Sequence, residues 1–399
     1  MTAPSANRGA VLVHVAVVLL ILLGVSALTI DLGVMWLSRG QAQNAADAGA
    51  YAGAISLAFD DGNDKSPAGP AVTKAVATAN QNSVFGQPAG VTPADVTFPT
   101  CPNDGTDTCV RVNVYRNQTR GNALPVFFAR LFGVTDQGVQ AMAIAQAGFG
   151  NSAKCLKPWA IPDKWDENYP ADVEWDWTNT FDLYDTSGNP IAPPDRYNGT
   201  EYLTMTDLNP LYTGFKASPP WPGPGDIGTQ VRLKMGSPHD APTPGWFQPI
   251  DLPVSGPDTG GARYRSNIAN CNPNTYQNGD DLTVEPGNMI GPTRQGVNDL
   301  LAKDPDSYWD AASKSVQCPP GGNCTGERLV SIPVYDPYWY ETNRHSGRVE
   351  IKISKVMGFF VVGMDGNDVL GYFVGAPAID DGTTPGDQSS WMRVIRLVR

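Results

Sequence analysis

The chain has 399 residues, of which 41% are hydrophobic and 17% charged, and its net charge at pH 7 is -12. No run of Lys or Arg interrupts this acidic background, which argues against nucleic acid as a partner, because surfaces that bind nucleic acid need clustered cations. The 42 glycines and 35 prolines are spread along the chain without a period. This composition indicates a loop-rich globular protein rather than a fibrous or disordered one.

The first feature in chain order is an apolar segment, Val11–Ile30, that contains no Asp, Glu, Lys or Arg. Twenty helical residues rise about 30 Å, which is the thickness of the hydrocarbon core of a bilayer. We therefore predict a transmembrane helix over residues 10–30, preceded by a cytoplasmic N-terminus over residues 1–9. Arg8 stands just before the span, which favours this orientation.

A cleaved secretory signal peptide is the alternative interpretation of the same segment. Val25, Ser26 and Ala27 match the small-x-small pattern that precedes a signal-peptidase cut. However, the apolar run continues to Ile30 and passes into a further helix-like stretch, whereas the apolar core of a signal peptide is shorter. We favour a retained anchor, and the alternative is a secreted binding protein or hydrolase released after Ala27.

Residues 31–59 predict a helix that continues out of the membrane, because they are rich in alanine and contain no proline. Small residues recur along this helix, with Ala46 near their centre. Such a surface allows another backbone to approach closely. Either a neighbouring subunit or the chain's own domain can cover it, and the sequence leaves both alternatives open.

Residues 60–150 predict a small α+β domain. A helical pattern comes first and is followed by three strand-like patterns. A short apolar segment with a proline near its start lies between the second and the third of these strands. The expected elements are a helix within residues 71–86, strands at Asp95–Phe98, Val110–Tyr115 and Gly138–Phe149, and a short helix at Leu124–Phe132. A helix that covers one face of an antiparallel sheet is sufficient to form a core.

Residues 151–399 predict a larger β-rich domain, because short strand-like runs alternate with clusters of Pro, Gly, Asn and Asp. The clearest hairpin spans Glu350–Gly375 around a turn at Asp365–Asp368. Gln295–Ala302 is expected to be a helix. Trp391–Arg399 alternates as a closing strand does.

The cysteines form an even set, which in an exported chain indicates three disulfides. They are Cys101, Cys109, Cys155, Cys271, Cys318 and Cys324. The short separations favour the pairs Cys101–Cys109 and Cys318–Cys324. The remaining two cysteines, Cys155 and Cys271, then form the third pair. Zinc is the alternative, but no C-x2-C pair occurs and no His lies near the cysteines in sequence.

The sequence offers few ingredients for catalysis. It has three histidines and no G-x-S-x-G, H-E-x-x-H or P-loop motif. The turn Asp365–Asp368 carries the hard oxygen ligands that calcium prefers, but Asp, Asn and Gly are also ordinary turn residues and the EF-hand spacing is absent. We therefore predict no catalytic residues, no cofactor, no metal site and no small-molecule substrate.

One aromatic run is the best sequence candidate for a partner-contact surface. It contains Tyr335, Tyr338, Trp339 and Tyr340, with Asp336 and Pro337 between them. Asp and Pro favour a loop, in which so many rings cannot all be buried. We therefore predict a loop that presents these rings to a protein partner.

The N-terminal motifs carry a family resemblance. Arg8-Gly9 before the span, Ile30-Asp31-Leu32-Gly33 at its end and Gln43–Ala48 in the following helix are together similar to the N-terminal segment of TadE/TadG-like proteins of tight-adherence (Flp-type) pilus assembly in bacteria. The resemblance implies a pilin-like plan and a structural or accessory role rather than catalysis. It also implies partners among other pilus or envelope subunits, contacted through the N-terminal helix.

Processing of pilin-type precursors follows a Gly whose fifth following residue is Glu. Here Gly9 and Ala10 flank the corresponding bond, but the residue at that spacing is His14. Cleavage at this bond is therefore a hypothesis that the sequence leaves open.

The fold class predicted from these elements is α+β. It comprises a long N-terminal transmembrane, pilin-like helix, a small α+β head and a larger β-rich domain. The resemblance and the predicted span together imply a single-pass protein of the bacterial inner membrane, with most of the chain extracytoplasmic or in a surface filament.

Overall fold

The computed structural model describes residues 7–60, 62, 64–103, 105–150, 152–168, 173–174, 179–199, 213–216, 225–237, 239–256, 259–345, 349–379 and 391–398. The chain divides into two compact units. The first, the helix unit, comprises Met1–Leu57, Asp64–Gln146 and Ile395–Arg399. The second, the barrel unit, comprises Ala58–Asn63 and Ala147–Val394. The fold is α+β, as predicted, with the β-rich part in the larger unit.

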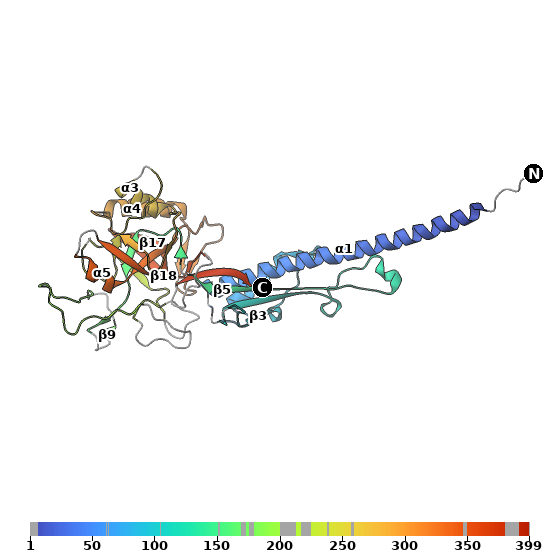
Figure 1. Ribbon diagram of the computed structural model, residues 1–399, viewed down its shortest axis with the longest axis horizontal. Coiled ribbons are helices and arrows are strands. Elements are labelled where there is room, and N and C mark those ends of the chain that lie inside the picture. The colour runs from blue at the N-terminus through green and yellow to red at the C-terminus, as the bar shows by residue number, and fades with distance from the viewer. Residues whose placement is uncertain are drawn as a thin grey trace, which may run out of the picture. The chain divides into compact units, whose positions relative to one another are not determined.

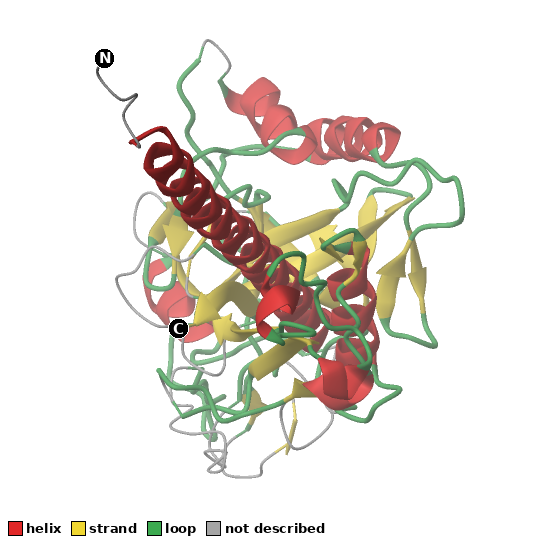
Figure 2. Cartoon of the chain, turned by 90° about the vertical axis from the view of Figure 1, so that its right-hand side faces the viewer, coloured by secondary structure: helices red, strands yellow, loops and turns green. Residues whose placement is uncertain are grey.

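The helix unit is built on α1, Asn7–Phe59, which is one uninterrupted helix of 53 residues (Figures 1 and 2). The apolar segment and the alanine-rich segment that follows it therefore form a single element. Neither contains a proline that would interrupt the backbone hydrogen bonds.

The head of the helix unit packs a second helix and a small sheet against the C-terminal half of α1. The helix is α2, Pro70–Gln81. The strands are β3 (Val96–Thr97), β4 (Cys109–Arg116), β5 (Val139–Phe149) and β20 (Met392–Val398), and they lie in the order β20-β5-β4-β3. β4 and β5 are antiparallel from Cys109 opposite Gln146 to Arg116 opposite Val139.

Shorter elements complete the helix unit. They are β1 (Ser83–Val84), β2 (Gln87–Pro88) and the 3-10 turns η1 (Pro93–Asp95), η2 (Gln118–Arg120) and η3 (Ala129–Phe132). The expected helix over Leu124–Phe132 is thus wrong except for its last turn. Leu124 instead pairs with Gln137 in an isolated antiparallel bridge, and the helical turn begins only where a carboxylate of α1 accepts the N–H groups of Phe127, Phe128 and Ala129.

Small residues on α1 make the close packing of the head possible. A Cβ added to Gly49 would lie 2.9 Å from the Cβ of Ala79 on α2 and 3.4 Å from Cγ1 of Val112 on β4. A Cβ on Gly53 would lie 2.8 Å from Cγ1 of Val110. α1 therefore lies in direct contact with both α2 and the sheet, and no larger side chain fits there.

The tight contact predicts opposite effects for two glycine substitutions in α1. Gly49→Leu should lower the free energy of unfolding by about 1–3 kcal/mol, because overpacking forces neighbouring atoms apart. Gly40→Leu should raise it by up to about 1 kcal/mol, because no atom lies within 4 Å of the added Cβ and leucine favours a helix. Urea unfolding of the detergent-solubilised chain tests both, and equal effects would contradict the packing described.

The barrel unit contains a mixed sheet that closes on itself. Its strands are β13 (Asp281–Thr283), β17 (Glu350–Asp365), β16 (Leu329–Tyr335), β7 (Trp159–Pro162), β11 (Trp246–Pro249), β10 (Gln230–Met235) and β18 (Asp368–Val374), in that order. β18 also pairs with β17, so the strands from β17 to β18 form a closed ring. Closure leaves β13 as the strand that extends the sheet beyond the ring.

The hairpin predicted at Glu350–Gly375 closes this ring. β17 pairs with β18 from Gly358 opposite Val374 to Asp365 opposite Asp368. The N-terminal part of β17, Glu350–Lys352, pairs with β13. β16 pairs with β17 from Ile353 to Phe360. A long strand is needed because β17 has three neighbours.

Aromatic side chains fill the core of the barrel unit. Trp159 on β7 contacts Phe247 on β11 and meets Phe359 on β17 edge to face, with ring centroids 6.5 Å apart. Trp165 and Trp391 are also buried. These rings form a core, whereas Trp175, Trp177 and Trp221 lie outside the described residues.

Among the described residues of the barrel unit, three helices accompany the barrel. They are α3 (Gly260–Ala269), α4 (Ile290–Lys303) and α5 (Pro337–Asn343). α3 and α4 pack on each other, and α4 and α5 both contact β17 (Figure 1). α4 contains the helix expected at Gln295–Ala302, whereas α3 was not predicted.

The remaining strands of the barrel unit form short antiparallel pairs and one parallel pair. They are β6 (Ser152–Ala153) with β12 (Tyr276–Gln277), β8 (Asp166–Glu167) with β9 (Val173–Glu174), β14 (Tyr308–Asp310) with β15 (Ser315–Gln317), and β19 (Ala376–Pro377) in parallel with Met392 and Arg393, in the part of β20 that belongs to the barrel unit.

The six cysteines form three disulfides with the pairing that the sequence favours. Cys101–Cys109 connects the beginning of β4 to the loop before it. Cys318–Cys324 closes a short loop, whereas Cys155–Cys271 joins residues 116 positions apart. The long loop restricts the unfolded chain most strongly.

A buried lysine supports the C-terminal end of α3. The Nζ of Lys157 donates to the carbonyl oxygens of Asn267 at 3.2 Å and Asn270 at 2.8 Å. Carbonyl groups at the end of a helix favour a cation. Burial nevertheless lowers the pKa of Lys157 to about 8, because its charged form has left water.

This pKa predicts that stability rises with pH between pH 7 and pH 9. The folded chain releases the Lys157 proton near pH 8, while the unfolded chain holds it to about pH 10.4, so the cost of the buried charge disappears as pH rises. The expected gain is about 1.3 kcal/mol in the free energy of unfolding. Lys157→Met should remove this gain, and an unchanged pH slope in the variant would contradict the assignment.

Candidate interaction surfaces

The first candidate surface is the apolar part of α1. Its large side chains are exposed on every side of the helix, as Leu12, Leu20 and Leu23 illustrate with exposed fractions of 73%, 69% and 64%. A helix that is apolar all round requires lipid or other protein to cover it. Among the described residues, α1 is the one helix that is long and apolar enough to cross a membrane.

Asp31 marks the end of this apolar surface. It is buried, and its carboxylate accepts three backbone hydrogen bonds: Oδ1 from Phe127 at 2.9 Å, and Oδ2 from Phe128 at 3.0 Å and Ala129 at 2.7 Å. In addition, Gln137 donates its side-chain N–H to the Asp31 carbonyl. The first residue after the apolar segment is therefore fastened to the loop of residues 124–134.

The small-residue surface of α1 is covered within the helix unit. Ala42, Ala45, Ala46, Ala50 and Ala54 are all fully buried. The sequence allowed either a neighbouring subunit or the chain's own domain to cover this surface, and in the structure the chain's own domain covers it. Ala46 is therefore not available to another subunit in this conformation, and partner contact through α1 must use other residues.

A cleft of about 960 Å³ lies beside α1 in the helix unit. Met35, Trp36, Arg39 and Gln43 line it from the helix, and residues 138–142 line it from β5. The amide of Gln43 donates to the carbonyl of Met142 at 3.1 Å and so connects its two sides. Trp36 is 75% exposed, so this cleft is a predominantly apolar surface rather than a site with acid–base groups.

The bond proposed for processing lies in the first turns of α1. Gly9 and Ala10 are helical, and their side chains lie outside what the structure describes. Cleavage there remains a hypothesis.

The predicted aromatic loop is wrong in its structure and in part of its exposure. Tyr335 ends β16, and Tyr338, Trp339 and Tyr340 belong to α5, whose N-terminus is capped by the carboxylate of Asp336 accepting from the Trp339 N–H at 2.9 Å. Asp followed by Pro is thus a helix start here. Tyr335 and Tyr340 are buried with ring centroids 5.1 Å apart.

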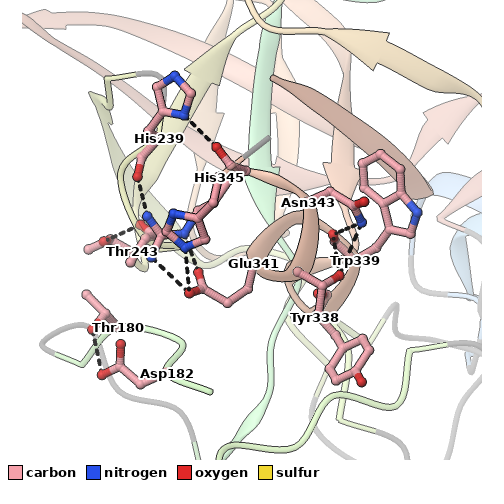
Figure 3. Close-up of polar contacts among 12 residues, drawn as sticks. Thr180, Asp182, His239, Thr243, Tyr338, Trp339, Glu341, Asn343 and His345 are labelled. Carbon is pink, nitrogen blue, oxygen red and sulfur yellow. Dashed lines mark hydrogen bonds and ion pairs between the residues drawn. The ribbon is translucent and has the colours of Figure 1, made fainter. Parts of the chain in front are cut away.

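Only part of the aromatic run reaches the surface. Tyr338 is 52% exposed and Trp339 is half-buried (Figure 3). The ammonium group of Lys352 lies over the Trp339 ring. The partner-contact prediction is thereby restricted to Tyr338 and Trp339.

The polar groups next to α5 form a structural network. Arg344 makes two hydrogen bonds to the buried Glu341, at 2.5 and 2.8 Å, and it also donates to the carbonyl of His239 (Figure 3). His345 lies 3.8 Å from the same carboxylate. Because Glu341 is held by the guanidinium group, the arrangement connects α5 to the loop at residues 237–243 and provides no free carboxylate base.

Asp163 and Lys355 form a buried ion pair that sequence reasoning missed. The Nζ of Lys355 lies 2.8 Å from Oδ2 of Asp163, and both side chains are almost fully buried. Asp163 also accepts from the Tyr197 hydroxyl at 2.9 Å and the Phe215 N–H at 2.8 Å. The pair therefore holds two loop segments against β7 and β17.

A signal for this pair exists in the sequence of β17. Lys355 shares its parity with Met357 and Phe359, so alternation directs all three side chains to the same face. Met357 and Phe359 are buried in the core of the barrel unit, and Lys355 is buried on their side of the strand. A lysine in an inward position requires a buried carboxylate.

The described residues contain no group of three His, Cys, Asp or Glu side chains placed to hold a metal ion. The carboxylate-rich turn after β17 is used otherwise. Asp365 forms an ion pair with Arg232, and Asn367 accepts a hydrogen bond from Arg294.

Family comparisons agree with the geometry of the helix unit. The Tad family model, for Flp pilus-assembly TadE/G-like proteins, matches residues 9–56, and the Tad_C model, for Tad-like Flp pilus assembly, matches residues 37–145. The N-terminal segment of this chain is thus similar to these two families. Comparisons with curated proteins and with solved structures gave no match.

The residues matched by the two Tad models, 9–145, are called the Tad segment, and they correspond closely to the helix unit. Its matches cover α1 and continue to residue 145, and the second stretch of the helix unit ends at Gln146. Asp31 and the buried small residues of α1 all lie within it. The chain is therefore related to Flp pilus assembly through its helix unit, and Tad pilus-assembly families are generally structural.

The Asp31 contacts predict a local effect of substitution in the Tad segment. Asp31→Ala should leave the amides of Phe127, Phe128 and Ala129 without acceptors, so their hydrogen exchange should accelerate while amides in β4 keep their protection. Asp136→Ala is the matched control, because Asp136 lies in the same region and accepts from the Thr135 hydroxyl. Exchange that is equally fast in both variants would contradict the role of Asp31.

Proposed function

We propose that this chain is a membrane-anchored, minor pilin-like structural or accessory component of a bacterial tight-adherence (Flp-type) pilus or a related envelope assembly, and that it is not an enzyme. The observation that carries the proposal is the division of α1. One continuous helix has an exposed apolar part and a part buried in its own head. This division is what a subunit needs if it is anchored by one end and folded at the other.

The matched families support the assignment to pilus assembly, and the span supports the anchor. Residues 11–30 have the length of the hydrocarbon core and expose their side chains. We place the N-terminus in the cytoplasm, and the head of the helix unit and the barrel unit outside it, where the three disulfides are stable. Single-pass residence in the inner membrane is part of the proposal.

Contact with other subunits is assigned to the exposed surfaces. The apolar part of α1 can pack against helices of neighbouring subunits in the membrane, and Tyr338 and Trp339 offer a smaller patch on the barrel unit. Ala46 is buried in the head, and we do not assign it this role.

The anchor predicts a position-dependent effect of charge on α1. Leu20→Lys places a charge at the middle of the span and should cost about 2.5–3.5 kcal/mol of insertion free energy. Less chain should then resist carbonate extraction from membranes, and less of each neighbouring pilus subunit should co-purify. Leu37→Lys is the control, because Leu37 is exposed on α1 but lies after Asp31.

Two results would contradict the proposal. Equal retention of the Leu20→Lys and Leu37→Lys variants would show that the span is not an anchor. Release of the unmodified chain into the medium as a species beginning at Leu28 would favour the alternative, a secreted binding protein or hydrolase cut after Ala27.

A further inference from the structure

We propose that the loop of residues 124–134 is a second membrane contact of this chain, in which Phe127 and Phe128 enter the headgroup region of the bilayer beside the point where α1 leaves the hydrocarbon core. The partner is a phospholipid surface. This inference rests on the proposed function, because it assumes that residues 11–30 span the membrane.

The hydrogen bonds of Asp31 determine the depth of this loop. Val11–Ile30 occupies about 30 Å of helix, so Asp31 lies where the hydrocarbon core ends. The N–H groups of Phe127, Phe128 and Ala129 lie 2.7–3.0 Å from its carboxylate. The loop is therefore held at the level of the membrane–water boundary and cannot move along α1 while these bonds persist.

The side chains of the loop have the chemistry of an interfacial segment. Phe127 is 52% exposed, Phe128 38% and Val134 44%. Arg130 is exposed in the same loop. Exposed aromatic rings with a neighbouring cation suit the interface, where the rings contact acyl chains and the guanidinium group contacts lipid phosphate.

α1 continues this surface on its next turns. Trp36 and Leu37 are 75% and 60% exposed, and Arg39 is also exposed. Trp36 lies only five residues beyond Asp31, a rise of about 7.5 Å, which keeps it within the headgroup layer. An aromatic residue and a cation at this level repeat the composition of the loop, on a chain whose overall net charge is -12.

A second copy of the chain is the competing occupant of this surface. The exposed cations and the continuity with the apolar part of α1 favour lipid instead, because the surface begins where the span ends. Two contacts with the membrane, the span and the loop, would also restrict how the head tilts on its helix.

Site-directed spin labelling of the full chain in phospholipid vesicles tests the inference. All six native cysteines are paired, so an introduced cysteine is the one reactive thiol. Labels are placed separately by Leu20→Cys in the span, Phe127→Cys in the loop and Ala77→Cys on an exposed position of α2. Accessibility to oxygen and to a water-soluble nickel complex then measures the depth of each label.

The expected order of depth is Leu20 deepest, Phe127 at the headgroup level and Ala77 in water. Adding Asp31→Ala to the Phe127→Cys chain should move its label toward water, while the same change leaves the Leu20 label in lipid. This pair of results distinguishes a loop held at depth by Asp31 from a loop that is apolar by chance.

Each contrary result has a separate meaning. If the Phe127 label is in water while the Leu20 label is in lipid, the loop contact is wrong and the anchor stands. If the Phe127 label is shielded from both reagents, protein covers the loop and the lipid assignment is wrong. If the Leu20 label is itself in water, the proposed function fails.

Discussion

The carboxylate of Asp31 is the constraint on which the organisation of the helix unit depends. It stands directly after an apolar segment whose side chains are exposed and before a segment whose small residues are buried. Its three backbone hydrogen bonds fasten the head to α1 at this boundary. The exposed part of α1 continues past this point to Trp36 and Leu37, and the small residues that form the core of the head begin at Ala42.

The C-terminal half of α1 packs in the core of the head instead of presenting an exposed surface. Gly49 and Gly53 leave room for Ala79 on α2 and for Val110 and Val112 on β4, so the helix and the sheet pack at close range. A surface of small residues can also mediate contact between subunits, but here the head already occupies it. The same reasoning assigns assembly contacts to the apolar part of α1, where nothing in the helix unit covers the side chains.

Elements with strong local patterns were predictable from the sequence. The apolar span, β4, β5 and the hairpin of β17 and β18 were predicted because their periodicity and turn residues are local properties. The closure of the barrel was not, because it also depends on β16 pairing with β7 and on β18 pairing with β10, and the strands of each pair are distant in sequence. The buried pair of Asp163 and Lys355 was missed for the same reason, since Asp163 lies 192 positions before its partner.

Two local predictions failed because a nearby side chain competed with the expected pattern. Leu124–Phe132 does not form a full helix, because Leu124 pairs with Gln137 and the Asp31 carboxylate accepts the N–H groups of residues 127–129, where the short helical turn begins. Tyr335–Tyr340 does not form a loop, because Asp336 caps α5 and Pro337 occupies its first turn. In both segments a carboxylate that accepts backbone N–H groups decided the conformation.

The intact mass of the mature chain, measured in parallel from isolated membranes and from the medium, tests the central claim that α1 remains one element from the apolar segment to the head. A membrane-bound species that starts at or before Ala10 is expected. A soluble species that starts at Leu28 would contradict it, because the chain would then have lost the exposed apolar part of α1 and retained only the part that Asp31 and the small residues attach to the head.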